Sequence, residues 1–194
     1  MLTIPNALTL LRLILVPFFL VASFHHSWTI AFVIFVTAAL TDILDGMLAR
    51  KLDQRSRLGA LLDPAADKIM MICGYLFYTL ESHLPRTGIP VWLTFTVFIR
   101  DFMILTFAYL LYTRVQVKRF PPSWAGKTST VLQFATLATT IAVNAFLPQL
   151  LMLAEVLFRV ALVVTLYSSW DYLRRGEQLL ENGLAQAVRS DARA

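Results

Sequence analysis

Cysteine is nearly absent from this sequence of 194 residues: Cys73 is the single one, and it lies within an apolar run. A lone cysteine cannot close a disulfide within the chain, so a disulfide-stabilised fold is excluded. The simplest interpretation of Cys73 is a small buried core residue.

Charge is scarce as well, because 15% of the residues are charged, 58% are apolar and the mean hydropathy is +0.67. No charged residue occurs in three long windows, Trp28–Leu40, Ile89–Ile99 and Val131–Phe146. Each window sits inside an apolar stretch of about 20 residues, the length that crosses the hydrocarbon core of a bilayer. The composition therefore predicts an integral membrane protein with no separate soluble domain.

Apolar runs separated by proline and glycine predict an all-α, polytopic membrane protein with six transmembrane helices. The helices are predicted at Pro5–Phe24, Trp28–Arg50, Arg57–Leu80, Ile89–Thr113, Thr128–Leu147 and Gln149–Arg174. The opening Met1–Arg12 is mildly amphipathic, so an N-terminal interfacial segment is expected there. Residues 1–176 are expected to form the membrane domain, and residues 177–194 a polar C-terminal tail that is a frayed helix or disordered.

The basic residues gather in the short loops on one side of the membrane. The predicted loops Lys51–Ser56 and Arg114–Lys127 carry most of them, whereas the loops on the opposite side offer only Arg86. The positive-inside rule then places both termini and both basic loops in the cytoplasm of a cell with this protein in its inner (plasma) membrane. A net charge of +5 spread over short loops, without one basic stripe, argues against nucleic-acid binding.

Four aspartates fall near the cytoplasmic ends of the second and third predicted helices. Asp42 and Asp45 are three residues apart and Asp63 and Asp67 are four apart, so each pair shares one helix face. The two helices run antiparallel around a short turn, and in the register that sets Asp45 opposite Asp63, Asp42 faces Asp67. The four carboxylates then converge about 8–13 Å below the cytoplasmic surface, at about 1.5 Å of rise per residue.

Ionised carboxylates inside a membrane helix are costly unless a cation neutralises them. An all-oxygen set suits a hard divalent cation such as Mg²⁺, Mn²⁺ or Ca²⁺, and it does not suit zinc because no histidine or second cysteine accompanies it. The small residues Gly46, Ala49 and Gly59 allow a bulky ligand to approach, and Arg50 adds positive charge at the mouth. In an alternative interpretation the acids only form ion pairs with nearby basic residues for packing and topology.

These residues stand in a longer pattern, Asp42-x2-Asp45-Gly46-x2-Ala49-Arg50-x8-Gly59-x3-Asp63-x3-Asp67. The pattern resembles the signature of the CDP-alcohol phosphatidyltransferases, and all eight of its fixed positions are filled within 26 residues. The six-span hydropathy of the whole chain is also similar to that family. A chance match of this length is very improbable.

The resemblance implies a Mg²⁺- or Mn²⁺-dependent enzyme of phospholipid biosynthesis, which transfers a phosphatidyl group from CDP-diacylglycerol to an acceptor alcohol and releases CMP. Asp42, Asp45, Asp63 and Asp67 are the implied metal ligands, and Asp67 is also the implied general base. The residues implied in binding the CDP-lipid are Asn6, Thr41, Asp42, Gly46, Ala49, Arg50 and Gly59.

Two further stretches resemble bacterial phosphatidylglycerophosphate synthases, whose acceptor is glycerol 3-phosphate. They are Pro5-Asn6-x-Leu8-Thr9-x2-Arg12 and Ser123-Trp124-x-Gly126-Lys127-x2-Thr130. Those enzymes have Arg-Glu where this chain has Arg100-Asp101, and a second arginine where it has Ala108. The stretch from Pro90 to Asp101 is more similar to cardiolipin synthases, whose acceptor is phosphatidylglycerol. Glycerol 3-phosphate is slightly favoured as the acceptor, and phosphatidylglycerol is the alternative.

Three basic residues are candidates for binding a phosphate on the acceptor: Arg100, Lys127 and Arg159. Arg100 and Arg159 lie near the middle of predicted spans, where simple ion pairing is an equally good interpretation. In that case Arg159 pairs with Glu155, one turn earlier, and Arg100 pairs with a carboxylate on a neighbouring helix.

A transporter or channel is the competing class, because acids within membrane helices are also typical of ion pathways. Such a protein is expected to show charges along a path, broken helices or an internal repeat. Here the acids cluster near one face beside basic loops, and no repeat is evident. A purely structural membrane protein would have no use for the acids. Since members of the family are commonly homodimers, the resemblance also implies a homodimer.

Overall fold

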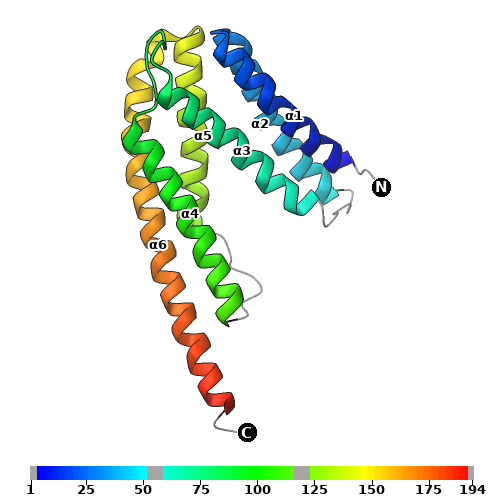
Figure 1. Ribbon diagram of the computed structural model, residues 1–194, viewed down its shortest axis with the longest axis vertical. Coiled ribbons are helices and arrows are strands. Elements are labelled where there is room, and N and C mark those ends of the chain that lie inside the picture. The colour runs from blue at the N-terminus through cyan, green and yellow to red at the C-terminus, as the bar shows by residue number, and fades with distance from the viewer. Residues whose placement is uncertain (1–3, 52–58, 116–122, 192–194) are drawn as a thin grey trace. The chain divides into compact units, whose positions relative to one another are not determined.

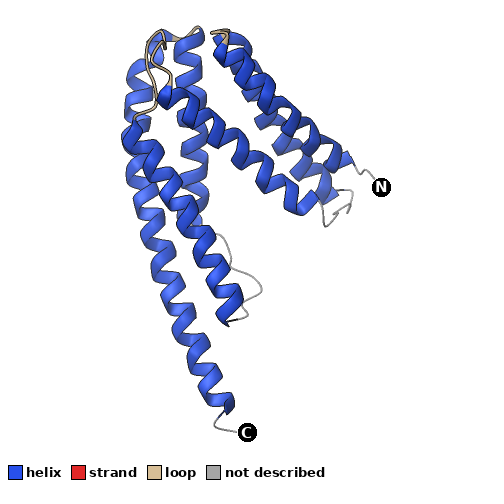
Figure 2. Cartoon of the chain, in the orientation of Figure 1, coloured by secondary structure: helices blue, strands red, loops and turns tan. Residues whose placement is uncertain are grey.

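The structure is a computed structural model that describes the backbone of residues 4–51, 59–115 and 123–191, and the side chains of residues 10–41, 68–107 and 123–176. Within these residues all repeating structure is helical and no strand occurs (Figure 2). The elements are α1 Ile4–Phe24, α2 Trp28–Lys51, α3 Gly59–Leu80, α4 Val91–Val115, α5 Trp124–Ala145, the 3₁₀ turn η1 Pro148–Leu150 and α6 Leu151–Asp191. The predicted all-α class is confirmed.

Two helix ends differ from the predicted ones by four residues or more, each for a physical reason. The fifth helix begins at Trp124 instead of Thr128, because the Ser123 hydroxyl accepts a hydrogen bond from the Gly126 N–H at 2.9 Å and caps it. The last helix continues to Asp191, well past the predicted end at Arg174. Its final stretch is rich in Ala, Leu, Glu and Gln, which have high helix propensity, so a polar composition there does not end the helix.

One segment of the described chain is long and apolar enough to cross a membrane. It covers Pro148–Gly176, which is 29 residues long and contains a window of 18 residues with a mean hydropathy of 2.1. Shorter apolar helices occur at Leu10–Phe24, Trp28–Thr41 and Lys68–Leu80. The number of six membrane spans therefore stays a prediction from the sequence.

The chain forms two compact units, which Figure 1 lets the reader trace by colour along the ribbon. The first unit contains residues 1–90 and 134–156, and the second contains residues 91–133 and 157–194. In the first unit α1 packs against both α2 and α3. The fully buried ring of Phe19 in α1 lies 6.1 Å from that of Phe35 in α2 and 6.4 Å from that of Tyr78 in α3, measured between centroids. Aromatic packing of this kind holds the three helices together.

The turn between α1 and α2 ends the first helix with a left-handed residue. His26 has a φ of 54°, its N–H donates to the Ser23 carbonyl, and the Ser27 N–H donates to the Ala22 carbonyl. This pair of bonds is the Schellman arrangement, in which glycine is the usual left-handed residue. A histidine in this position carries a steric cost that glycine would not have.

The segment between α3 and α4 is fastened to the end of α5 by Arg86 and Asn144. The Arg86 Nη1 donates to the carbonyls of Val143 at 2.8 Å and of Asn144 at 3.1 Å. In return, the Asn144 side-chain oxygen accepts the Arg86 N–H at 3.0 Å, and its amide donates to the Thr87 carbonyl at 2.7 Å. Arg86, which the sequence places apart from the other basic loop residues, thus satisfies the last carbonyls of α5.

In the second unit α4 and α6 run in the same direction and the first half of α5 runs opposite to them. Arg100 of α4 bonds to Ser168 of α6, and further along both helices a Cβ built on Gly176 would come within 2.8 Å of the Phe107 ring. The α5–α6 contact is a hydrogen bond of 3.1 Å between the hydroxyls of Ser129 and Thr165, which are buried. The Gln133 side-chain amide donates a further hydrogen bond to the Ser129 hydroxyl at 3.1 Å. Neutral polar groups thus link α5 and α6.

Many hydroxyls along the helices bond to the carbonyl four residues earlier in the same helix. The described examples are Thr37, Thr41, Thr96, Thr106, Thr128, Thr130, Thr140 and Ser169. Each hydroxyl proton is satisfied within its own helix, so it requires no partner from another helix.

Candidate active site

The register of α2 against α3 is visible in the turns that precede the acids. The Trp28 ring at the start of α2 lies 6.0 Å from the Tyr78 ring near the end of α3. Later in α2, Ala38 and Ala39 line a small cavity together with Met70, which comes earlier in α3. The two helices are therefore antiparallel, and Ala39 and Met70 each lie within two turns of the acids of their own helix.

All four aspartates occupy helical backbone in these two elements. Asp42 and Asp45 follow Ala39 in α2 within two turns, and Asp63 and Asp67 precede Met70 in α3 within two turns. Their side chains lie outside the part of the structure whose side chains are described. Among the residues that are described, no three His, Cys, Asp or Glu side chains group into a metal site.

Arg12 of α1 is a buried charged side chain close to the acid-bearing turns. It is 1% exposed and lines the small cavity with Ala38, Ala39 and Met70. Ala38 and Ala39 are one turn from Asp42, and Met70 is one turn from Asp67. A buried guanidinium is stable only with polar or anionic groups around it, so this position puts a cation beside the part of the helices that carries the acids.

Thr41 is the predicted CDP-lipid residue whose side chain is described. Its hydroxyl turns back onto its own helix and bonds to the carbonyls of Ala38 at 2.7 Å and Thr37 at 3.0 Å. The other predicted residues of that group lie in α1, α2 and at the first position of α3, with side chains outside the description: Asn6, Asp42, Gly46, Ala49, Arg50 and Gly59.

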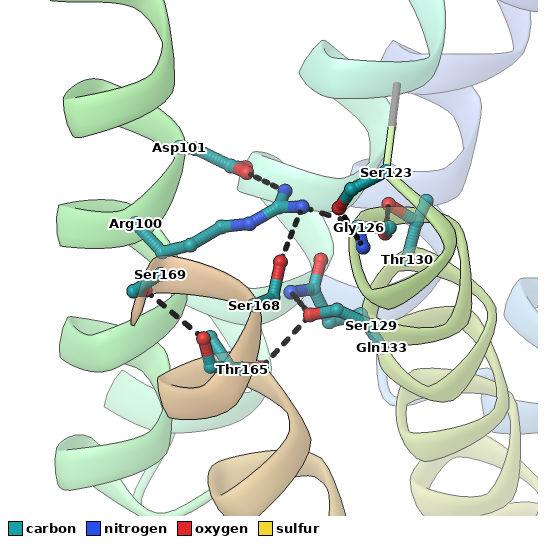
Figure 3. Close-up of polar contacts among 10 residues, drawn as sticks. All are labelled: Arg100, Asp101, Ser123, Gly126, Ser129, Thr130, Gln133, Thr165, Ser168 and Ser169. Atoms are coloured by element: carbon teal, nitrogen blue, oxygen red, sulfur yellow. Dashed lines mark hydrogen bonds and ion pairs between the residues drawn. The ribbon is translucent and has the colours of Figure 1, made fainter. Parts of the chain in front are cut away.

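Arg100 stands at the centre of a polar network in the second unit (Figure 3). It is 5% exposed, and its Nη1 donates to Asp101 Oδ1 at 2.8 Å. Its Nη2 donates to the Ser168 hydroxyl at 3.2 Å and, at 3.4 Å, weakly to the Gly126 carbonyl. The Tyr172 ring centroid lies 5.7 Å from the guanidinium carbon. The ion pair expected with a neighbouring helix thus forms with the next residue of α4, while neutral groups of α5 and α6 complete the network.

The first turn of α5 is built tightly against this network. Ser123, which is 1% exposed, caps the helix through the Gly126 N–H. A Cβ on Gly126 would lie 3.0 Å from the Tyr172 hydroxyl and 3.2 Å from Arg100 Nη2. Only a residue without a side chain fits there without displacing both neighbours.

Lys127 follows Gly126 and is exposed, unlike Arg100. Its Nζ lies 5.2 Å from the ring centroid of Trp124, which is itself 81% exposed. An exposed ammonium at the start of a helix adds to the positive end of the helix dipole, so this position favours an anionic group.

The structure does not bring Arg159 to the same place as Arg100 and Lys127. Arg159 is exposed on α6, nine residues before Ser168, which corresponds to about 13.5 Å along the helix and the opposite helix face. Glu155 lies one turn before Arg159 on this exposed side of α6. Of the three predicted phosphate-binding residues, two are therefore near each other.

Five residues of these networks were not singled out from the sequence as site residues: Arg12, Asp101, Ser123, Ser168 and Tyr172. Arg12 offered a signal, since a charge within an apolar helix needs a buried partner. Ser123 offered another, because a serine just before an apolar helical stretch is an N-cap signature. Ser168 and Tyr172 carry no such signal, because their role depends on the tertiary contact with Arg100.

A protein family and several bacterial proteins are similar to this chain over most of its length. The family model described as CDP-alcohol phosphatidyltransferase matches residues 2–167. A protein of Salmonella typhimurium named CDP-diacylglycerol--glycerol-3-phosphate 3-phosphatidyltransferase is 34% identical over 181 residues, covering 91% of this chain and 97% of its own length. A Shigella flexneri protein of the same name is 35% identical over 173 residues, or 88% and 92%. A probable phosphatidylglycerophosphate synthase of Mycobacterium tuberculosis is 33% identical over 176 residues, or 88% and 79%.

Proposed function

Since the chain belongs to the CDP-alcohol phosphatidyltransferase family, we propose that it is a phosphatidylglycerophosphate synthase. It transfers the phosphatidyl group of CDP-diacylglycerol to glycerol 3-phosphate and releases CMP. The observation that carries this proposal is the near full-length similarity to bacterial proteins named for that reaction. The same membership argues against an ion transporter, the competing class for intramembrane acids.

The family is divalent-metal dependent, and the chain's own residues fit a divalent cation. The proposed ligands are Asp42, Asp45, Asp63 and Asp67, an all-oxygen set that suits Mg²⁺ or Mn²⁺. The antiparallel register of α2 and α3, read at Ala39 and Met70, supports their convergence. When bound, the metal polarises the pyrophosphate and offsets negative charge on the departing CMP.

In the reaction the oxygen of the acceptor hydroxyl bonds to the phosphorus that carries the diacylglycerol, and the bond from that phosphorus to CMP breaks. We assign Asp67 as the base that takes the hydroxyl proton, because a carboxylate within reach of the hydroxyl can accept its proton as the new bond to phosphorus forms. Gly46, Ala49 and Gly59 leave room for the nucleotide, and Arg50 meets its phosphates. Asn6 and Thr41 complete the proposed CDP-lipid site. The Thr41 hydroxyl donates its proton to its own helix, and its oxygen can still accept a hydrogen bond from the ligand.

For the acceptor, Lys127 is the best-supported phosphate ligand. It is exposed at the N-terminus of α5, where the helix dipole and its own charge both favour an anion. Arg100 lies against the same first turn, and Arg159 belongs to the proposed set on the basis of its charge within an apolar segment. The phosphate of glycerol 3-phosphate supplies the dianion that this positive region selects.

In the membrane, the proposed arrangement has six spans, with both termini and the acid-bearing ends toward the cytoplasm. The apolar segment Pro148–Gly176 and the basic loops support this orientation. A membrane domain over residues 1–176, followed by the polar stretch 177–194, and assembly as a homodimer in the bacterial inner membrane complete the proposal.

A direct test is to incubate the purified protein, with Mg²⁺, with CDP-diacylglycerol and either glycerol 3-phosphate or phosphatidylglycerol. Phosphatidylglycerophosphate and CMP are expected only with glycerol 3-phosphate. Product formed only with phosphatidylglycerol would replace the proposal by a cardiolipin synthase. One observation favours that second candidate: Asp101 follows Arg100 where the glycerol 3-phosphate enzymes have glutamate, and Ala108 stands where they have arginine.

A further inference from the structure

Three of the five N–H groups of the Arg100 guanidinium donate to protein groups, whereas the buried Nε–H has no partner among the described residues. Nη1 donates to Asp101 Oδ1 at 2.8 Å, and Nη2 divides its two N–H groups between the Ser168 hydroxyl and the Gly126 carbonyl. A two-pronged contact with phosphate needs two adjacent N–H groups that are unoccupied. The charge is also balanced by Asp101, and the Arg100 side chain is 6% exposed. A two-pronged contact of an acceptor phosphate with Arg100 uses at least one N–H of Nη2, so it would displace Ser168 or Gly126.

The same contacts fix the place from which Lys127 projects. The first turn of α5 is held by Arg100 at the Gly126 carbonyl and by the Tyr172 ring, which leaves no room for a side chain at Gly126. The Gly126 carbonyl also accepts the Thr130 hydroxyl at 3.1 Å, and the Gly126 N–H donates to Ser123. Lys127 is the next residue along the chain and is exposed. Movement of this turn would move its ammonium group directly.

Resting on the proposed function, we propose that Arg100 is a positioning residue of the acceptor site. It locks the first turn of α5 against α4 and α6, and it acts on glycerol 3-phosphate through Lys127, which binds the phosphate. Arg100 is in turn held in place by its contacts with Asp101, Ser168 and Tyr172. Only a side chain with two donating nitrogens can bond to Asp101, Ser168 and Gly126 together, so lysine cannot replace it.

A double-mutant cycle tests this proposal. Arg100→Gln and Lys127→Gln are each expected to raise the KM for glycerol 3-phosphate about tenfold, the size of losing a hydrogen bond to a charged group, with a smaller change in kcat. The double variant is expected to match Lys127→Gln alone, because Arg100 acts through Lys127. KM increases that multiply in the double variant would show that Arg100 binds the phosphate independently and would overturn the proposal.

Two further variants separate positioning from charge. Ser168→Ala leaves the charge of Arg100 intact and is expected to raise the same KM by a few fold, because Arg100 keeps its bonds to Asp101 and Gly126. Arg100→Lys keeps a positive charge and is expected to behave like Arg100→Gln. Recovery of the wild-type KM by Arg100→Lys would contradict positioning, because charge alone would then be sufficient.

A measurement independent of turnover distinguishes failure of this inference from failure of the proposed function. With Cys73→Ser as background, Lys127→Cys provides a single site for a nitroxide spin label. Arg100→Gln is expected to add a more mobile component to the electron paramagnetic resonance spectrum, and an unchanged spectrum would overturn the positioning role. A wild-type protein that makes no phosphatidylglycerophosphate would instead overturn the proposed function, whatever the spectrum shows.

Discussion

In the first unit the four aspartates lie on two helices that follow each other in the sequence, whereas in the second unit Arg100 meets groups from three helices. The acids are spaced by three and four residues along α2 and α3, so helix geometry alone gathers each pair. The partners of Arg100 come from positions 101, 126 and 168, which only tertiary packing brings together. In the proposed enzyme the first arrangement concentrates charge for chemistry, and the second neutralises charge to hold a position.

The largest effect is expected at Asp67 in the first unit. Asp67→Asn removes the proposed base and is expected to lower the rate of CMP release by about 10²–10⁴-fold, the usual contribution of general base catalysis. Binding of CDP-diacylglycerol, measured by calorimetry in detergent, is expected to persist. Asp171→Asn is the matched control, since Asp171 forms a partly exposed ion pair with Arg175 at 3.0 Å and should leave the rate unchanged. Near-normal activity of Asp67→Asn would remove Asp67 from this role.

Arg12 tests whether the first unit balances its acids with its own cation. Arg12→Gln is expected to lower the thermal midpoint measured without metal, because the acids lose a neighbouring positive charge. Added Mg²⁺ is expected to raise the midpoint more in the variant than in the wild type, since the metal then supplies more of the compensation. Equal Mg²⁺-induced shifts in the two proteins would show that Arg12 does not act on the acids. Arg12→Lys, which keeps the charge, is the control.

Arg86 provides a purely structural counterpart to Arg100. Arg86→Ala leaves the carbonyls of Val143 and Asn144 without this donor and is expected to reduce stability by about 1–3 kcal/mol. The activity of the folded fraction at 20 °C is expected to stay within about twofold of wild type, because surface changes of this kind act on stability and not on chemistry. A rise in the KM for glycerol 3-phosphate would place Arg86 in the same functional group as Arg100 and weaken the contrast between them.

The smallest effect is expected at the turn between α1 and α2. His26→Gly relieves the left-handed backbone at φ 54° and is expected to raise stability by up to about 1 kcal/mol. His26→Ala, which keeps the strain and loses the contact with the Trp28 ring, is expected to lower it. Thermal unfolding of the two variants side by side is the measurement. A lower midpoint for His26→Gly than for His26→Ala would show that the side chain outweighs the backbone strain.

The helices were largely predictable because apolar runs and loop residues coincide with their ends. Four predicted starts or ends at α1 and α2 lie within one residue of the observed ones. The start of α5 was predicted four residues too late, because Ser123 caps the helix at Trp124. The end of α6 was predicted too early, because the polar residues after Arg174 have high helix propensity and continue the helix.

The candidate site also contains residues that could be predicted from the sequence and residues that could not. Spacing within a helix identified the acids, whose helical positions follow from the sequence itself. The partner of Arg100 could not be found in this way, since any carboxylate on a neighbouring helix was an equally good candidate. Its actual partner, Asp101, is the adjacent residue, which helix geometry normally directs to another face. Burial of Arg12 was also inaccessible, because it depends on how α1 packs against α2 and α3.

The hydroxyls that bond within their own helices bear on how this protein is made. A helix whose threonines already donate to its own carbonyls exposes fewer unsatisfied polar groups when it enters the bilayer alone. Insertion and assembly can then be separate steps, with the bond between Ser129 and Thr165 forming only when α5 meets α6. A helix pair that lacks this bond, as in Ser129→Val, would still insert and would reveal the defect only in the association of the two helices.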